Sequence, residues 1–172
     1  MSKTSINASP KRPSVGSPHH PGEVKALGRF GGVVTFCLYG PVGPRKARDF
    51  TASKLIAIIQ AGLPVRELEQ LQVSLDLPAG ILGTKLGISK ATLHRRKASG
   101  RLRPEESDRV VRFARLMGKA IEVLETEENA RRWLTSAQVG LGGAIPLDYA
   151  ETEVGAREVE DLLGRIEYGV YS

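Results

Sequence analysis

From Thr51 to the carboxyl end of the chain, apolar residues recur at the three- and four-residue spacing of α-helices. Residues that favour helix ends divide this pattern: Gly62 follows the first apolar cluster, Ser89 precedes a later one, and Pro104 opens the longest. Strands would instead alternate apolar and polar residues. The sequence shows neither a βαβ rhythm nor an internal repeat, so we predict an all-α fold from about residue 51.

The start and stop residues give the approximate limits of each predicted element. Pro64 and Pro104 are expected at the first position of their helices, and Ser89, Thr126 and Thr152 are expected as amino-terminal caps. We expect helices over 51–61, 64–75, 78–86, 89–98, 104–124, 126–134 and 152–170, a glycine-rich connection at 136–145, and a short turn at 146–150.

The first fifty residues follow a different pattern. Residues 1–28 are rich in Pro, Ser, Lys and Gly, and too poor in apolar residues to offset chain entropy, so we expect disorder. Residues 33–39 are largely β-branched, aromatic or aliphatic, which predicts a short strand or extended arm that pairs with another chain, lies on the surface or is disordered. Residues 40–46 contain two Pro and two Gly and are expected to form a linker. We therefore divide the chain into a flexible basic tail (1–50), a helix-turn-helix domain (51–103), and a helical connection with a carboxyl-terminal domain (104–172).

Charge is distributed unevenly along the 172 residues. Residues 1–50 and 51–103 each carry a net charge of +6, whereas residues 104–172 carry −6. A basic front favours a polyanion such as nucleic acid, and an acidic back favours a protein with a positive cleft. A basic tail on an ordinary domain is the alternative explanation.

Composition excludes several classes of protein. The single Cys37 excludes an intramolecular disulfide framework and a multi-cysteine metal site, and we expect it to be an inert apolar filler. No apolar run reaches the roughly 18 to 20 residues of a membrane span, and the polar amino terminus does not suit a secretory signal, so we expect a cytoplasmic protein. His94 has no nucleophile beside it by motif, so we expect neither an enzyme nor a bound cofactor.

The segment from Leu82 to Leu93 has the pattern of a helix-turn-helix. Gly83 supplies a small contact where two helices cross, and Gly87 accepts the positive φ that the turn needs. The second helix would place its first residues at base edges in the major groove and its later cations at phosphates. The alternative is a solvated basic face. The expected DNA-contacting residues are Ser89, Lys90, Thr92, Arg95, Arg96, Lys97 and Arg101, with Arg103 beyond them.

The carboxyl end is unusually apolar for a chain terminus. Tyr168, Val170 and Tyr171 close the sequence before Ser172, whereas termini are usually polar and frayed. These residues indicate docking, either on the chain's own core or on a partner.

Two stretches of sequence resemble a known family. The first comprises Gly87–Ser89, Thr92–Lys97, Gly100–Leu102 and Pro104–Arg109. It is similar to the helix-turn-helix of Xre/MbcA/ParS-type antitoxins. The second comprises Ile145–Leu147, Glu153, Gly155–Val159 and Leu162–Ser172, and is similar to that family's toxin-binding domain. The resemblance covers about residues 51–172. It departs at 148–150, where Asp-Tyr-Ala stands in place of the expected leucines.

The resemblance implies a bacterial antitoxin encoded beside a RES-domain toxin that consumes NAD. The antitoxin's carboxyl end would block the toxin's active site, the pair would bind its own operator as double-stranded DNA, and the antitoxin would form a homodimer or higher oligomer. In this hypothesis Tyr168, Val170 and Tyr171 fill the apolar part of the cleft, and the carboxylate of Ser172 pairs with a cleft arginine. The expected toxin-binding residues are Glu153, Arg157, Glu160, Arg165, Glu167, Tyr168, Gly169, Val170, Tyr171 and Ser172.

Two other functions fit the same residues. The chain would be a stand-alone helix-turn-helix regulator if its last helix only dimerises, or a helical scaffold if it binds no DNA. A neighbouring toxin gene favours the antitoxin over the regulator, and salt-dependent promoter binding excludes the scaffold.

Overall fold

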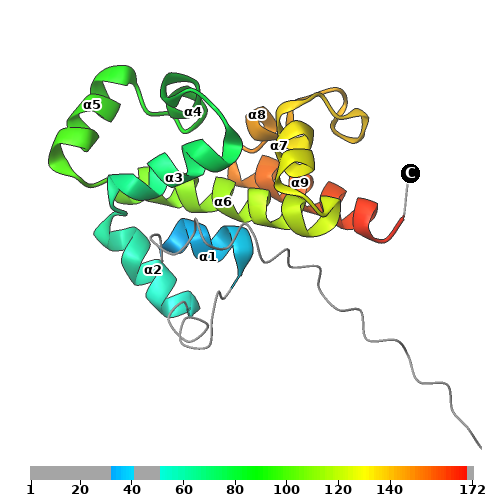
Figure 1. The fold of residues 1–172 in the computed structure, drawn as a ribbon, viewed down its shortest axis with the longest axis horizontal. Coiled ribbons are helices and arrows are strands. Elements are labelled where there is room, and N and C mark those ends of the chain that lie inside the picture. The colour runs from blue at the N-terminus through cyan, green and yellow to red at the C-terminus, as the bar shows by residue number, and fades with distance from the viewer. Residues whose placement is uncertain (1–31, 41–50, 170–172) are drawn as a thin grey trace, which may run out of the picture. The chain divides into compact units, whose positions relative to one another are not determined.

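The structure is a computed structural model that describes residues 32–40 and 51–169 (Figure 1). Its backbone in these ranges is helical, with two isolated β-bridges and no strand, which confirms the all-α prediction there. The predicted disorder of residues 1–28 and most of the predicted linker lie outside these ranges. The elements are α1 (Val33–Tyr39), α2 (Ala52–Ala61), α3 (Val65–Leu75), α4 (Ala79–Lys85), α5 (Lys90–Ser99), α6 (Pro104–Leu124), α7 (Glu127–Thr135), the 3-10 helix η2 (Val139–Leu141), α8 (Pro146–Tyr149) and α9 (Glu153–Glu167).

Helix α6 is the element against which most of the others pack. It contacts α1, α2, α3, α7 and α9, and Figure 1 shows it running through the bundle from the α5 side toward α9. Its buried face includes Val110, Phe113, Ala114 and Met117, the helical spacing that the sequence predicted. Since α6 packs against both α3 and α9, it belongs to the cores of both halves. The predicted domain boundary between residues 103 and 104 stays a prediction.

The predicted caps are present at the starts of three helices. The hydroxyls of Ser89, Thr126 and Thr152 accept hydrogen bonds from backbone N–H groups three residues on, at 3.1 to 3.2 Å. Pro104 occupies the first position of α6, as expected. Pro64 was predicted at the first position of its helix. The structure places it one position earlier, as the residue that precedes the first turn of α3.

The prediction of a strand or extended arm at residues 33–39 was wrong. These residues form α1, which buries Val33, Val34 and Leu38 in the core. The buried carboxylate of Glu67 accepts a hydrogen bond of 2.9 Å from the Val34 N–H, and so satisfies a donor in the first turn of α1. Packing and this distant cap outweigh the strand preference of the β-branched side chains.

Helix α1 approaches α6 closely at one glycine. A Cβ added at Gly118 would lie 2.0 Å from the carbonyl oxygen of Cys37, so no side chain fits there. Cys37 itself is half-buried beside this contact, and burial raises the pKa of its thiol to about 11. None of the helices in the described part of the chain has the length and apolar composition to cross a bilayer.

Candidate functional site

Helices α4 and α5 and the turn between them form a helix-turn-helix. Gly87 has a φ of +65°, the positive value that the turn was predicted to need. Gly83 supplies the predicted small contact: a Cβ there would lie 3.0 Å from the Ile88 carbonyl oxygen. The Ile88 N–H donates to the Gly83 carbonyl at 2.7 Å, and Leu82 and Leu93 are buried on either side of the turn. The motif is therefore closed by backbone contacts that larger residues would block.

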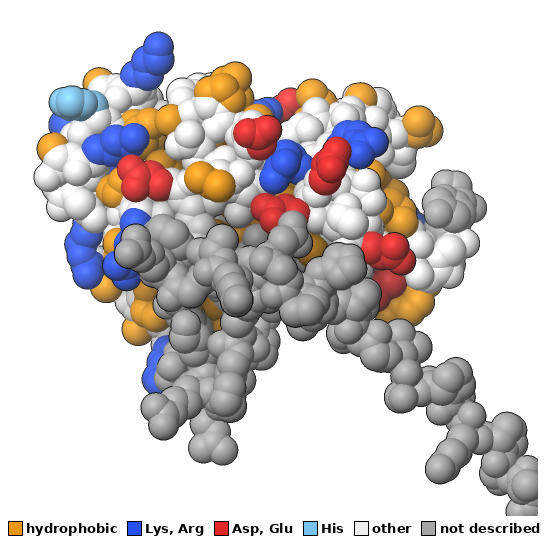
Figure 2. All heavy atoms as spheres, viewed as in Figure 1, with side chains coloured by type: hydrophobic (Ala, Val, Ile, Leu, Met, Phe, Trp, Pro, Cys, Tyr) orange, Lys and Arg blue, Asp and Glu red, His pale blue; other side chains and the backbone are white. Residues whose placement is uncertain are grey.

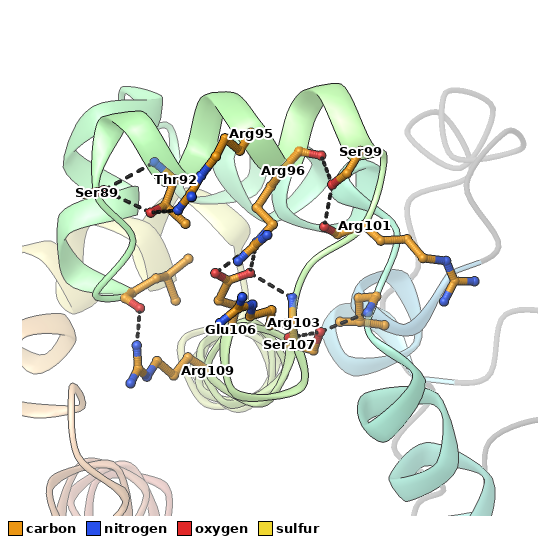
Figure 3. A network of polar contacts seen from close by, with 12 residues as sticks. Ser89, Thr92, Arg95, Arg96, Ser99, Arg101, Arg103, Glu106, Ser107 and Arg109 are labelled. Atoms are coloured by element: carbon orange, nitrogen blue, oxygen red, sulfur yellow. Dashed lines mark hydrogen bonds and ion pairs between the residues drawn. The ribbon is translucent and has the colours of Figure 1, made fainter.

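Arg109 on α6 gives a second reason for a glycine at position 87. Its Nη1 donates a hydrogen bond of 2.8 Å to the carbonyl of Leu86 at the end of α4. The same Nη1 would lie 2.6 Å from a Cβ at Gly87. Position 87 thus needs a glycine both for its left-handed backbone and for the close approach of the Arg109 guanidinium. Through its hydrogen bond to Leu86, Arg109 holds the turn against α6 (Figure 3).

Helix α5 carries four Lys or Arg residues and no Asp or Glu. Lys90 and Arg95 are exposed, and in Figure 2 several Lys and Arg side chains lie over the part of the molecule that contains α5. Lys97 is also exposed, and its Nζ lies 3.6 Å from an oxygen of Glu69. An exposed ion pair of this length contributes little to stability, so Lys97 stays available to a phosphate.

Arg96 has a different position from its neighbours. Its Nε donates to both carboxylate oxygens of Glu106, at 2.8 and 3.1 Å, and only 15% of its side chain is exposed. Burial raises the pKa of the Glu106 carboxyl, but hydrogen bonds from Arg96 and from the Arg103 N–H outweigh burial and lower that pKa overall. The same hydrogen bond raises the pKa of Arg96. Arg96 therefore links α5 to α6 (Figure 3), and its predicted contact with DNA stays a prediction.

Arg101 also binds the chain's own backbone. Its Nη1 donates to the carbonyls of Ala61 and Gly62, at 2.9 and 3.0 Å, which satisfies acceptors at the carboxyl end of α2. This use of its guanidinium was not predicted, and a phosphate contact for Arg101 stays a prediction. The hydroxyl of Ser89 is likewise used in capping α5, and that of Thr92 accepts from Arg95 at 3.2 Å.

Three ion pairs join α9 to α6. Arg112 pairs with Glu153 at 3.1 Å, Arg115 with Glu160 at 3.1 Å, and Lys119 with Glu167 at 2.7 Å. The three carboxylates are seven residues apart on α9, so one stripe of that helix lies along the cations of α6. The buried Nε of Arg112 is within ion-pair distance of Glu153 but lacks hydrogen-bond geometry, so we read this contact as electrostatic.

These pairs give three acidic residues of α9 partners within the chain itself. Glu153, Glu160 and Glu167 were predicted to bind a partner, and the structure shows them bound to the chain's own α6. Their contact with a toxin stays a prediction. Arg157 lies 3.3 Å from Glu153 on the same helix.

The end of α9 exposes an aromatic residue. Tyr168 is 79% exposed directly after the helix, and Gly169, which follows it, has a φ of +67°. Val139 in η2 is 95% exposed, while its neighbour Gly140 packs against Leu162 of α9. Arg165, also predicted to bind a partner, is exposed on the last turns. The other predicted residues, Val170, Tyr171 and Ser172, lie outside the described residues.

Sequence reasoning missed the residues of α6 that hold α5 and the neighbouring turns in place. Glu106 and Ser107 lie in the first turn of α6, and neither was predicted to have a partner elsewhere in the chain. The sequence does contain one signal, since a glutamate at the third position of a helix commonly accepts from the backbone N–H before it, as Glu106 does from Arg103 at 2.7 Å. Nothing local indicated that Arg96 would be its second partner.

The fold and these surfaces define a helix-turn-helix protein whose carboxyl-terminal helices α7 and α9 pack against α6. Residues 54–115 match the antitoxin Xre-like helix-turn-helix domain, and residues 119–169 match the antitoxin Xre/MbcA/ParS carboxyl-terminal toxin-binding domain. The chain belongs to the Xre/MbcA/ParS family of antitoxins, and is thus a non-enzymatic antitoxin of a toxin–antitoxin system.

Curated relatives agree with this assignment. An antitoxin Xre of Yersinia enterocolitica is 36% identical over 120 residues, which cover 69% of this chain and 81% of the relative. An antitoxin Xre of Photorhabdus laumondii is 33% identical with the same coverage. A Prs ADP-ribosylating antitoxin of Sphingobium is 25% identical over 127 residues, which cover 68% of this chain and 80% of the relative. Helix α1 lies outside both family matches.

Proposed function

We propose that this antitoxin neutralises a RES-domain, NAD-consuming toxin with its carboxyl-terminal segment, and binds its own operator DNA through α5 to regulate transcription. The observation that carries the proposal is the placement of two unlike surfaces on α6. The basic α5 packs at the start of α6 through Arg96 and Glu106, and the acidic α9 is bound further along it through Lys119 and Glu167.

The DNA-binding half rests on the exposed side of α5. Lys90, Arg95 and Lys97 face solvent, and no acidic residue lies on that helix to repel a phosphate. The first turn of the second helix of such a motif enters the major groove, so we expect Lys90 and Thr92 near base edges. Lys97 lies later on the helix, where a phosphate contact fits better.

The toxin-binding half rests on the family match and on the exposed end of α9. A cleft that binds NAD must accept a pyrophosphate, so it would carry cations. Glu158 and Asp161 are exposed on α9 and, among the described residues, form no ion pair with α6, so they are free to steer this helix toward such a cleft. Tyr168 combines a large apolar surface with a hydroxyl, a combination common in residues that anchor interfaces.

Co-expression with the neighbouring gene product tests the toxin half. Cells should survive with the full chain but not with a chain truncated after Leu163, and Tyr168→Ala should weaken protection. Tyr149→Ala is the matched control, because Tyr149 is a partly exposed tyrosine on α8. Equal survival with the truncated chain would contradict the blocking role of the carboxyl end.

Binding to a labelled fragment of the chain's own promoter tests the DNA half. Affinity should fall steeply with salt, and Lys97→Ala should weaken binding broadly and reduce the salt slope by about one unit. Glu69→Gln removes the partner of Lys97 without removing a cation and should not weaken binding. Binding that is absent at low salt would contradict the regulatory role.

A further inference from the structure

The connection between α7 and α8 carries no charged side chain. No Lys, Arg, Asp or Glu lies between Arg132 and Asp148, although these residues make up 26% of the whole sequence. Exposed positions ordinarily favour polar or charged side chains. A surface without cations does not suit DNA, whereas the centre of a protein–protein interface is typically depleted in charge. The exposed residues of this stretch are Ser136, Ala137, Val139, Gly140, Gly142 and Gly143.

Residues 138–144, which we call the η2 loop, are closed by their own hydrogen bonds. The Gln138 N–H donates to the Ala144 carbonyl at 3.0 Å, and the Gly143 N–H donates to the Gln138 carbonyl at 2.9 Å. The Gln138 side chain also donates from its Nε2 to the Trp133 carbonyl at 2.9 Å. Gly143 has a φ of +86°, a value that favours glycine. Because these bonds fix the shape of the loop, a partner would not need to order it on binding.

The η2 loop presents one valine to solvent. Val139 is 95% exposed, and its carbonyl accepts a hydrogen bond of 2.9 Å from the Gly142 N–H. A side chain this exposed buries almost no area against the chain's own core, so its apolar surface is available to a partner. The β-branched side chain is stiff at χ1, so its burial in a pocket costs little side-chain entropy.

The η2 loop adjoins α9 close to its exposed end. A Cβ at Gly140 would lie 2.6 Å from the Cδ1 of Leu162, so the loop lies directly against α9. Leu162 precedes Tyr168 by six residues, or about 9 Å along the helix axis. Figure 1 shows the loop between α7 and α8 at the same end of the bundle as the end of α9, away from α5. A protein bound at the end of α9 would therefore meet the η2 loop as well.

We propose that the η2 loop is a second binding site for the toxin, and that Val139 enters an apolar pocket on the toxin beside the cleft that the carboxyl end blocks. The inference rests on the proposed neutralisation of a toxin and adds a division of roles to it. The loop contributes binding affinity, whereas the carboxyl end blocks the active site. Binding through the loop raises the effective concentration of the carboxyl end at the cleft.

Calorimetric titration of the full chain with the purified product of the neighbouring gene tests the loop. Val139→Asp should raise the dissociation constant by roughly tenfold or more, because a carboxylate would have to enter an apolar pocket. Val73→Asp is the matched control, since Val73 is 75% exposed on α3 and should leave the dissociation constant unchanged. Both valines are exposed, so both variants should melt as the wild type does.

Inhibition of NAD consumption by the same gene product separates the two roles. Val139→Asp should still inhibit fully once its concentration exceeds the raised dissociation constant. A chain truncated after Leu163 should instead leave the activity in place at every concentration, because it retains the η2 loop but lacks the blocking segment.

Each part of the proposal has a result that contradicts it. An unchanged dissociation constant for Val139→Asp, or an equal loss of affinity in Val73→Asp, would overturn the second site and leave the proposed blockade standing. Full inhibition by the truncated chain would contradict the blockade alone. If Val139→Asp reduced the size of the free antitoxin in sedimentation, the loop would join copies of this chain and the inference would be wrong. A wild type that does not bind the gene product would overturn both proposals.

Discussion

Arg96 on α5 donates two hydrogen bonds from its Nε to the carboxylate of Glu106 on α6, at 2.8 and 3.1 Å. Both side chains are largely withdrawn from solvent, and Glu106 also accepts from the Arg103 N–H. One charged pair thus fastens α5 and closes the first turn of α6. The cations of α5 divide into one that holds the helix and others that face outward.

Arg96→Ala should lower the free energy of unfolding, because it removes charged hydrogen bonds and leaves the Glu106 carboxylate without them. Urea denaturation measures the loss. Arg95→Ala is the control, since Arg95 is exposed, and it should weaken promoter binding with little change in stability. If Arg96→Ala unfolded as the wild type does and lost only DNA affinity, Arg96 would be a phosphate contact after all.

Stability should depend on pH through Glu106. A carboxyl whose pKa is lower in the folded chain than in the unfolded chain contributes stability above the unfolded value, about 4.3, and loses it as pH falls through the folded value. The stability difference between wild type and Glu106→Gln should therefore be constant from neutral pH to about pH 5 and shrink below about pH 4. Urea denaturation from pH 7 to pH 3 checks this, and a gap that widened in acid would contradict it.

The helices that sequence predicted correctly are those whose signals are local. Ser89, Thr126 and Thr152 each cap the helix that follows them, and Gly87 itself adopts the positive φ of the turn. In each case the residue that gives the signal lies within a few residues of the structure that it predicts. Helix α1 was missed because its cap, Glu67, lies 33 residues from Val34 in the sequence.

The candidate sites were predicted as regions rather than as individual residues. Sequence gives Arg95 and Arg96 the same helix and the same charge, and only the position of α6 decides which one is covered. The acidic residues of α9 present the same problem, because Glu160 and Glu158 differ only in whether a cation of α6 faces them. Composition predicts the charge of a surface but not its internal pairing.

Two glycines in helices should respond oppositely to alanine. Gly118→Ala places a Cβ 2.0 Å from the Cys37 carbonyl oxygen, a backbone atom that cannot yield without moving α1, so we expect a loss of about 2 kcal/mol. Gly164→Ala in α9 meets no atom within 4 Å and should gain about 0.5 to 1 kcal/mol from helix propensity. Thermal unfolding of the two variants measures both effects, and an equal response would contradict the close α1–α6 contact.

The last turn of α9 should be held by Lys119 and Glu167, whose charged groups lie 2.7 Å apart. The hydrogen bond from Lys119 to Glu167 raises the pKa of the lysine, which indicates that the charged pair favours the docked helix end. Glu167→Gln should therefore speed amide hydrogen exchange at Tyr168 and Gly169 severalfold and leave global stability within about 1 kcal/mol. Glu128→Gln removes an exposed pair with Arg132 on α7 and should leave that exchange unchanged. Unaltered exchange at Tyr168 in Glu167→Gln would mean that packing of Leu163, rather than the ion pair, fixes the end of the helix.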